Sequence, residues 1–158
     1  MGCAEIEVKM GSGKIIFMGR TGSGKTTLCQ KLDTLELKYK KTQSVELYHN
    51  AIDTPGEYME NRNFYRALIM TAVDAKLIAI LGDPTVRDNY IPPAFAGTFA
   101  KEIIGIVTKV TLADSNEDIM RVELELRQAG AKKIFHVDTV EEIGIEELFQ
   151  YIHERIDN

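Results

Sequence analysis

A glycine-rich turn joins an apolar run to a predicted helix near the start of this sequence. The run KIIFMG occupies residues 14–19, and RTGSGKTT follows it directly. A short apolar run that ends at glycine predicts a buried strand, and the turn has the spacing G-x-x-x-x-G-K-T. The backbone N–H groups of such a turn face the N-terminus of the next helix, where an anion is stabilised. We therefore expect a phosphate-binding loop between a strand and a helix.

Each residue type in this loop has an expected task. Lys25 is expected to reach the β- and γ-phosphates and to act in catalysis, and the Thr26 hydroxyl to bind Mg²⁺. The alternative is an ordinary glycine-rich turn, and the order of strand, loop and helix argues against it. The residues expected to contact the nucleotide are Arg20, Thr21, Gly22, Ser23, Gly24, Lys25, Thr26 and Thr27.

Apolar strands alternate with helices along the rest of the chain. Strands are predicted at 14–19, 50–53, 75–82, 101–109 and 132–138, and helices at 25–34, 62–74, 115–130 and 144–156. This alternation predicts an α/β fold with a mostly parallel sheet of about five to six strands between two helical layers. The prolines of the segment 82–100 restrict any helix there to a short piece.

The ends of the helix at 115–130 are the clearest in the sequence. Ser115 and Asp118 form a variant of the capping box, and Gly130 ends the helix. Its expected buried stripe consists of Ile119, Val122, Leu126 and Ala129. The last helix is expected to turn Ile145, Leu148, Phe149, Ile152 and Ile156 towards the core.

Bulk properties narrow the class of protein. A length of 158 residues suits a single domain, expected at 14–158, preceded by a leader at 1–13. The leader is read as a mobile tail, with an edge strand or a partner-binding extension as alternatives. A net charge of −5 argues against nucleic acid as a partner, and no apolar run approaches the roughly 18 residues that span a membrane. Two cysteines without a disulfide pattern indicate a cytoplasmic protein.

The sequence DTPG at 53–56 follows a predicted strand. Asp53 is expected to hold magnesium through a water molecule, and the Gly56 amide to meet the γ-phosphate. Between the two motifs, LKYKKTQS is read as a basic loop in which Thr42 binds magnesium in the triphosphate state. Only 11 positions separate Thr42 from Asp53. We therefore expect a shortened or missing hairpin of the second and third strands.

The elements that would bind the base are incomplete. Guanine-binding proteins carry [NT]-K-x-D at the end of a strand, and this chain has Thr108 and Lys109 followed by Thr111 in the Asp position. Losing that carboxylate lowers guanine preference by about 1.5–3 kcal/mol, unless Asp114 folds back to replace it. The final element, normally a Ser-Ala turn, is VDTV at 137–140, where Thr139 is the candidate replacement for the serine.

Together these motifs resemble the Ras-like superfamily of small P-loop GTPases. More narrowly, LKYKKTQSVE, AIDTPGEYMENRNFYRAL, PPAFAGTFAKEIIGIVTK and GAKKIFHVDTVEEIGIEEL resemble the EutP/PduV family of ethanolamine and propanediol utilisation, over residues 14 to 156. The resemblance implies a compact Ras-like fold, Mg²⁺ with GTP/GDP or ATP/ADP, and association with bacterial microcompartment shell or enzyme proteins.

The catalytic machinery leaves three functions open. Glu57 occupies the position after the DTPG glycine, where many switch proteins carry the glutamine that orients water. No arginine is obviously placed as an arginine finger, and nothing in the sequence supports Arg20 or Arg62 in that role. The first function is a GTPase-like switch with slow intrinsic hydrolysis. The second is an ATP-using phosphotransferase of the small-carboxylate or acetate kinase type. The third is a degenerate scaffold.

Overall fold

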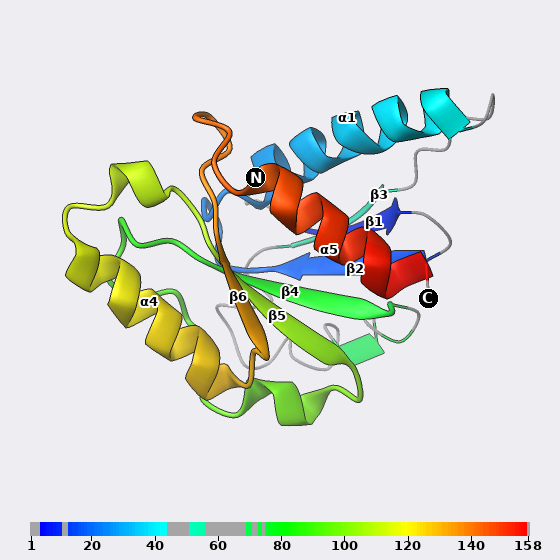
Figure 1. Cartoon of the computed structure of the whole chain (residues 1–158). Helices are drawn as coiled ribbons and strands as arrows, with labels where there is room; N and C mark the ends of the chain where they lie inside the picture. Colours follow the sequence, from blue (N-terminus) through cyan, green and yellow to red (C-terminus); the bar gives the residue numbers. More distant parts are fainter. Residues whose placement is uncertain are drawn as a thin grey trace.

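The computed structural model describes residues 4–10, 13–43, 51–55, 69, 70, 73 and 75–157. In these residues a six-stranded sheet lies between helices on its two faces, with the strand order β3-β1-β2-β4-β5-β6 (Figure 1). The strands are β1 Ala4–Met10, β2 Gly13–Met18, β3 Ala51–Pro55, β4 Leu77–Gly82, β5 Glu102–Val107 and β6 Lys133–His136. The run β2-β4-β5-β6 is parallel throughout. The expected α/β architecture and mostly parallel sheet are confirmed.

The strand β1 differs from the mobile tail expected for the leader. It pairs antiparallel with β2 on one side and with β3 on the other, so it is an inner strand and not an edge strand. The alternation of charged and apolar residues in EIEVKM has the period of two that a strand requires. The antiparallel neighbour of β3 therefore comes from the start of the chain.

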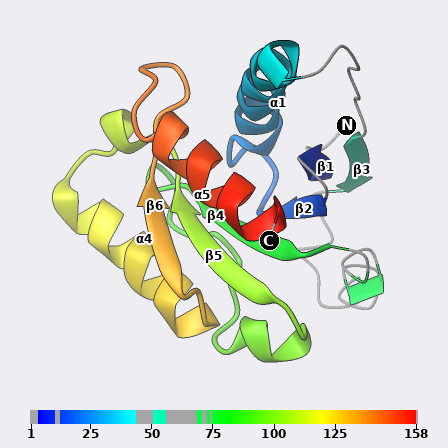
Figure 2. The same cartoon turned by 45° about the vertical axis from the view of Figure 1, so that its right-hand side comes forward.

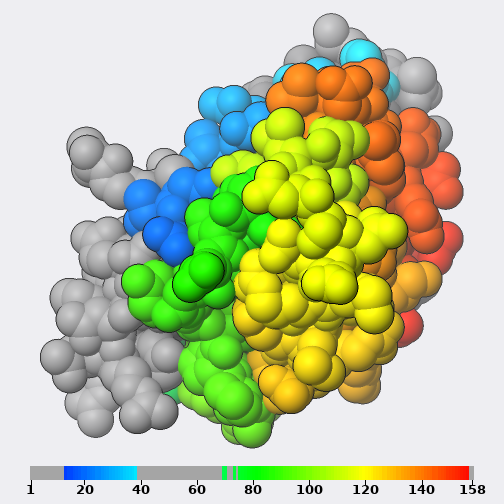
Figure 3. Space-filling model, turned by 90° about the vertical axis from the view of Figure 1, so that its left-hand side faces the viewer, coloured from blue at the N-terminus to red at the C-terminus, as the bar shows by residue number. Residues whose placement is uncertain are grey.

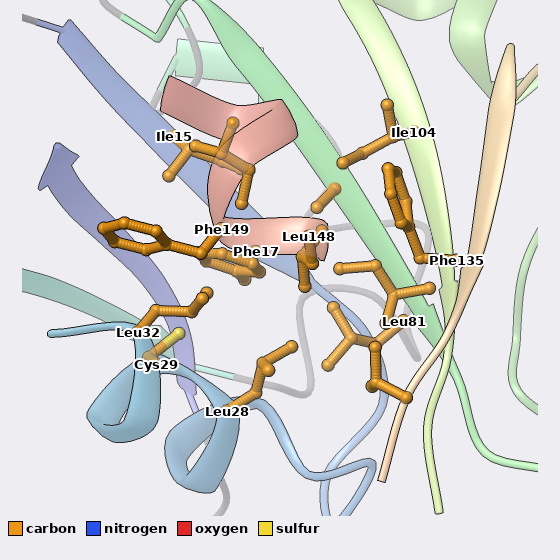
Figure 4. Packing of buried hydrophobic residues seen from close by; sticks show 14 of the residues in the cluster. Ile15, Phe17, Leu28, Cys29, Leu32, Leu81, Ile104, Phe135, Leu148 and Phe149 are labelled. Carbon is orange, nitrogen blue, oxygen red and sulfur yellow. The ribbon is translucent and has the colours of Figure 1, made fainter. Parts of the chain in front are cut away.

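Two helices cover one face of the sheet, and their buried side chains form the larger core. α1 (Lys25–Gln43) and α5 (Ile145–Asp157) pack on this face (Figure 2). Phe17 and Leu81 from the sheet meet Leu28 and Leu32 from α1 and Leu148 from α5 (Figure 4). The buried stripe predicted for the last helix is confirmed, because all five of its residues are at most 8% exposed.

The opposite face carries α4 (Asn116–Ala129), whose ends match the sequence prediction. The Ser115 side chain accepts a hydrogen bond from the Asp118 N–H, and Gly130 adopts φ = 105° at the C-terminus. Val122, Leu126 and Ala129 are buried against the sheet, with Ile119 beside them. In the space-filling view α4 (yellow) lies next to the segment after β4 (green) (Figure 3).

The first helix is longer than predicted. Residues 25–34 were expected to be helical and 37–44 to form a loop, but α1 continues to Gln43. The sequence contains no glycine or proline between Lys25 and Thr54, so nothing in it breaks the helix. The helix expected at 62–74 lies largely outside the described residues.

The segment 83–100 contains only short helical structure. The 3₁₀ helix η3 spans Phe95–Thr98, which confirms the restriction predicted from the prolines. A second 3₁₀ helix, η4, spans Val110–Leu112 after β5. None of the helices in the described part of the chain is long and apolar enough to cross a membrane.

Candidate functional site

The turn between β2 and α1 has the backbone geometry that its glycines allow. Gly22 and Gly24 adopt φ values of 81° and 103°, which side chains with a Cβ rarely tolerate. The Ser23 N–H donates to the Arg20 carbonyl over 3.2 Å and closes the turn. The turn leads directly into the N-terminus of α1, whose partial positive charge favours an anion.

Lys25 lies inside this turn and is fully buried. Its ammonium donates to the Gly19 carbonyl over 2.6 Å and to the Arg20 carbonyl over 3.0 Å. A buried ammonium is costly unless it finds strong acceptors, and the carbonyls of the turn supply them. The turn therefore holds a positive charge at the start of the helix.

The hydroxyl groups of the turn differ in exposure. Thr26 and Thr27 are exposed in the first turn of α1, Thr21 is half-buried and Ser23 is fully buried. Within the described residues, Ser23 Oγ is the one buried side-chain polar atom without a hydrogen-bond partner. Such an atom is uncommon in folded proteins and often marks a position where an ion or ligand completes the site.

The end of β5 is tied to the same turn. The Thr108 hydroxyl donates to the Ser23 carbonyl over 2.8 Å. Lys109, with φ = 52°, donates through Nζ to the Gly22 carbonyl over 2.7 Å and to Asp83 Oδ2 over 2.8 Å. Thr108 and Lys109, predicted as base contacts, are thus brought against the predicted phosphate contacts.

A pocket of about 260 Å³ opens beside these two residues. The turn and α1 contribute Gly24 and Thr27, and the segment after β6 contributes the opposite wall. The lining consists of Gly24, Thr27, Thr108, Lys109, Thr111, Leu112, Asp138, Thr139, Val140 and Glu141. Thr139, the candidate replacement for the serine, therefore lies in the wall of the same pocket.

Thr111 and Asp138 form a pair in this pocket. The Thr111 hydroxyl donates to Asp138 Oδ2, and the Thr111 N–H donates to the same oxygen over 3.2 Å. The Glu141 N–H donates to Asp138 Oδ1 over 3.0 Å. Burial raises the pKa of Asp138, but the hydrogen bonds from Thr111, Glu141 and Val140 outweigh burial and hold that pKa below its ordinary value.

Asp138 was not predicted as a site residue from the sequence. The carboxylate missing at position 111 is present in the pocket, 27 residues further along the chain. Asp114, the candidate replacement, is not part of the pocket lining. The available signal was an acidic residue two positions after the end of β6, in VDTV.

Arg20 points to the segment after β4. Its Nη1 donates to the Asp88 carbonyl over 2.5 Å, and its guanidinium lies 5.3 Å from the centre of the Tyr90 ring. That segment is itself fixed, because Asp83 and Asn89 hydrogen-bond each other through backbone and side chain. Arg20 therefore bridges the turn and this segment in the described arrangement.

Two of the expected magnesium ligands are not brought to the turn. Thr42 lies in the last turn of α1, 16 residues after Thr26, which corresponds to about 24 Å along a helix. The segment expected to be a loop is helical here, and magnesium binding by Thr42 stays a prediction. Asp53 lies in β3, two strand spacings or about 10 Å from β2, because β1 lies between them. Gly56 and Glu57 lie outside the described residues.

The donor set fits the phosphates and base of a nucleotide better than it fits a complete metal site. Positive charge, turn N–H groups and a helix N-terminus meet next to a pocket of suitable size. For Mg²⁺, the described residues offer the exposed Thr26 hydroxyl at the correct end of α1. They contain no group of three His, Cys, Asp or Glu side chains that could hold a metal ion.

The chain is similar to known proteins over most of its length. The family model for ethanolamine utilisation and propanediol utilisation proteins (PduV-EutP) matches residues 12–154. The propanediol utilization protein PduV of Citrobacter freundii is 39% identical over 140 residues, covering 89% of this chain and 93% of that protein. The probable acetate kinase EutP of Escherichia coli (strain K12) is 28% identical over 88% of both chains. Its namesake from Salmonella typhimurium is 30% identical over 143 residues, again 88% of both chains.

Among solved structures, the chain is similar to Era in complex with MgGDPNP and a segment of 16S ribosomal RNA. The TM-score is 0.60 at 13% identity, and the match covers 95% of this chain and 58% of that one. At this identity the likeness concerns the fold. The fold is the Ras-like P-loop fold that the motifs predicted.

Proposed function

The chain belongs to the ethanolamine and propanediol utilisation family, and from this premise we propose that it binds a purine nucleoside triphosphate together with Mg²⁺. In this proposal the triphosphate lies along the turn at residues 19–27 and the base enters the 260 Å³ pocket. Hydrolysis is slow in this proposal. The surface that the protein presents to partners differs between its triphosphate and diphosphate states. The protein therefore acts as a nucleotide-dependent switch.

The buried ammonium of Lys25 carries this proposal. It is held by two carbonyl oxygens of the turn, directly before a helix N-terminus. Phosphate oxygens are stronger acceptors for an ammonium than neutral carbonyls are. Lys25 would therefore transfer its hydrogen bonds to the β- and γ-phosphates, and the Ser23 hydroxyl would gain the partner that it lacks.

The described residues account for binding better than for fast turnover. Bound Mg²⁺ would neutralise phosphate charge, with the Thr26 hydroxyl as its ligand from this chain. Arg20 is engaged with the Asp88 carbonyl and Tyr90, away from the phosphate concavity. Glu57 remains the proposed water-orienting residue, and a carboxylate next to γ-phosphate oxygens is a weak catalyst. Slow intrinsic hydrolysis is therefore expected from these catalytic groups.

Nucleotide titration tests the proposal. Fluorescent GTP and ATP analogues are titrated into the protein with and without Mg²⁺, and the Kd values are compared with those of Lys25→Ala. Lys38→Ala is the matched control, because Lys38 is an exposed lysine on the same helix. We expect Lys25→Ala to weaken binding at least tenfold and Lys38→Ala to leave it unchanged. Equal loss in both variants, or no binding by the unaltered chain, would reject the proposal.

A second function, phosphotransfer to a small carboxylate, is favoured by the relatives named probable acetate kinase. In that reaction a carboxylate oxygen attacks the γ-phosphorus, the bond to the β-phosphate oxygen breaks, and the nucleoside diphosphate leaves as an acyl phosphate forms. Arg20 is the proposed cation for the acceptor carboxylate, and it would have to leave the Asp88 carbonyl and Tyr90 to reach it. Incubation with ATP and acetate, followed by trapping of acyl phosphate with hydroxylamine, separates the two functions. Hydroxamate formation would establish the kinase, and acetate-independent phosphate release would establish the hydrolase.

We also propose a cytoplasmic location and an association with bacterial microcompartments, which the family resemblance implies. Shell and enzyme proteins encoded with such relatives are the proposed partners. Co-sedimentation of the purified chain with purified shell proteins, in its triphosphate and diphosphate states, tests this association. Binding that is independent of the nucleotide would contradict the switch.

A further inference from the structure

The hydroxyl and the carboxylate of the base pocket have exchanged places relative to the guanine-binding pattern. That pattern has Asp in the position of Thr111 and a hydroxyl residue in the turn after the last strand. In this chain the hydroxyl is at Thr111 and the carboxylate is at Asp138, and the two are hydrogen-bonded. Thr111 is exposed at the pocket wall, whereas Asp138 is only 3% exposed. The hydroxyl therefore stands in front of the carboxylate.

Both oxygens of the Asp138 carboxylate already accept hydrogen bonds from protein groups. A carboxylate offers about four lone-pair sites. The Thr111 hydroxyl and N–H both donate to Oδ2, and the Glu141 N–H donates to Oδ1, so each oxygen already accepts from the protein. Asp138 is thus committed to protein groups and cannot offer a base the pair of oxygens that a direct contact would need.

The same bond fixes the chemical character of Thr111. A hydroxyl has one proton and two lone pairs, and the proton of this one is given to Asp138. Its remaining capacity towards the pocket is that of an acceptor. A lone oxygen cannot match two parallel N–H donors in the way that a carboxylate does.

We propose that Asp138 is a positioning residue that holds Thr111 as a single acceptor, so that the pocket reads one N–H of a purine and not the 2-amino group. This inference rests on the proposed nucleotide binding and specifies which purines the site accepts. Guanine and hypoxanthine nucleotides bind alike. Adenine nucleotides bind at most about tenfold more weakly, because one neutral hydrogen bond contributes about 0.5–1.5 kcal/mol.

Base selectivity of matched variants tests the inference. Kd values for GTP, ITP and ATP are measured with Mg²⁺ for the unaltered chain, Thr111→Val, Asp138→Asn and the exchange variant Thr111→Asp with Asp138→Ser. GTP and ITP differ only by the 2-amino group. We expect a GTP to ITP ratio within threefold for the unaltered chain and above tenfold for the exchange variant, where a carboxylate faces the pocket. Thr111→Val should bring the GTP to ATP ratio close to one.

A single substitution, Thr111→Asp, provides the control for folding. It places two carboxylates together and should lower the melting temperature, which Asp138→Ser in the exchange variant should restore. A tenfold GTP preference over ITP in the unaltered chain that Asp138→Asn abolishes would overturn the inference, because Asp138 would then read the base itself. An exchange variant that binds nucleotide with unaltered selectivity would also overturn it. Failure of all variants and of the unaltered chain to bind would instead reject the proposed nucleotide binding.

Discussion

Asp138 combines burial with several hydrogen-bond donors, and this combination makes its charge a source of stability. Its folded-state pKa lies below the ordinary value of 3.8. A carboxyl group with a depressed folded pKa contributes stability that is present above its unfolded pKa and is lost as the pH falls through the folded value. The pair with Thr111 should therefore weaken in acid.

The first prediction concerns the pH dependence of this contribution. Asp138→Asn should lower the free energy of unfolding by about 1.5–3 kcal/mol at neutral pH, because it removes a charged acceptor of several hydrogen bonds. The gap between the unaltered chain and the variant should narrow below about pH 4. Urea unfolding at pH values between 7 and 3 measures both free energies. A gap that stays constant over this range would show that the carboxylate charge is not involved.

The second prediction compares two glycines. Gly130 has φ = 105°, and an added Cβ would lie 2.4 Å from the Ala96 Cβ. An added Cβ at Gly97 would meet nothing within 4 Å. Gly130→Ala should destabilise the protein by more than about 1 kcal/mol, whereas Gly97→Ala should change stability by less than about 0.5 kcal/mol. Thermal melts of both variants measure this contrast, and equal effects would contradict it.

Local chemistry explains which site residues the sequence could reveal. Thr108 and Lys109 could be recognised because they are adjacent in a short motif at the end of a predicted strand. Their contacts with the turn agree with that motif. The partnership of Thr111 with Asp138 joins positions 27 residues apart, and no local pattern predicts it. The exchange of two residue types looks like two unrelated mismatches until the fold brings them together.

Among the elements, the strand β1 departs most from the sequence expectation. Residues 4–10 have strand periodicity, but periodicity does not identify the partners of a strand. The pairing depends on β3, which is more than 40 residues away in the chain. Long-range pairing of this kind is decided by the whole sheet.

Hydrogen exchange tests the placement of β1. If β1 is an inner strand, the amides of Ile6 and Val8 should exchange at rates comparable with those of β2. Mass spectrometry of exchanged peptides that cover residues 1–12 reports this protection. Full exchange within seconds would support a mobile tail instead.

Helix ends could be predicted only where capping residues mark them, as a comparison of α4 with α1 shows. The ends of α4 are encoded by Ser115 and Gly130, so both were found. No capping residue marks the C-terminal end of α1, which lies at Gln43. The helix was therefore predicted to end too early, because a loop was expected at 37–44. Caps fix helix ends in sequence terms, and the absence of a cap leaves them open.

Two leucine substitutions, one on α5 and one on α4, show how much the packing of α5 contributes to stability. Leu148 is fully buried among α1, α5 and the strands, and Leu124 on α4 is 56% exposed. Leu148→Ala should cost about 2–5 kcal/mol, and Leu124→Ala less than about 0.5 kcal/mol. Chemical denaturation of the two variants gives both values, and a large loss at Leu124 would indicate that this face is covered by a partner.

At the scale of the whole molecule, the turn, the base pocket and the end of β5 form one connected unit. Thr108 and Lys109 bond the turn, and Asp138 bonds the segment that follows β5. A ligand that bridges turn and pocket should therefore stabilise the entire domain. Binding to the folded state alone adds about 2.7 kcal/mol when the ligand is at 100 times its Kd.

The melting temperature should therefore depend on bound nucleotide. Saturating Mg²⁺-GTP should raise the melting temperature of the unaltered chain by several degrees, as measured by differential scanning calorimetry. The rise for Lys25→Ala under the same conditions should be clearly smaller, because its binding is weaker. A similar rise in both proteins would mean that the nucleotide binds elsewhere.

The antiparallel direction of β1 has a practical consequence for handling the protein. Ile6 pairs with Phe17, so Ala4 lies at the end of the sheet that carries the phosphate-binding turn (Figure 1). The other terminus leaves from the far end of the sheet, where Lys76 Nζ donates to the Ile156 carbonyl over 2.9 Å. A purification tag or surface tether attached at the N-terminus would therefore lie close to the proposed nucleotide site and hinder binding. The same attachment after α5 leaves that site open.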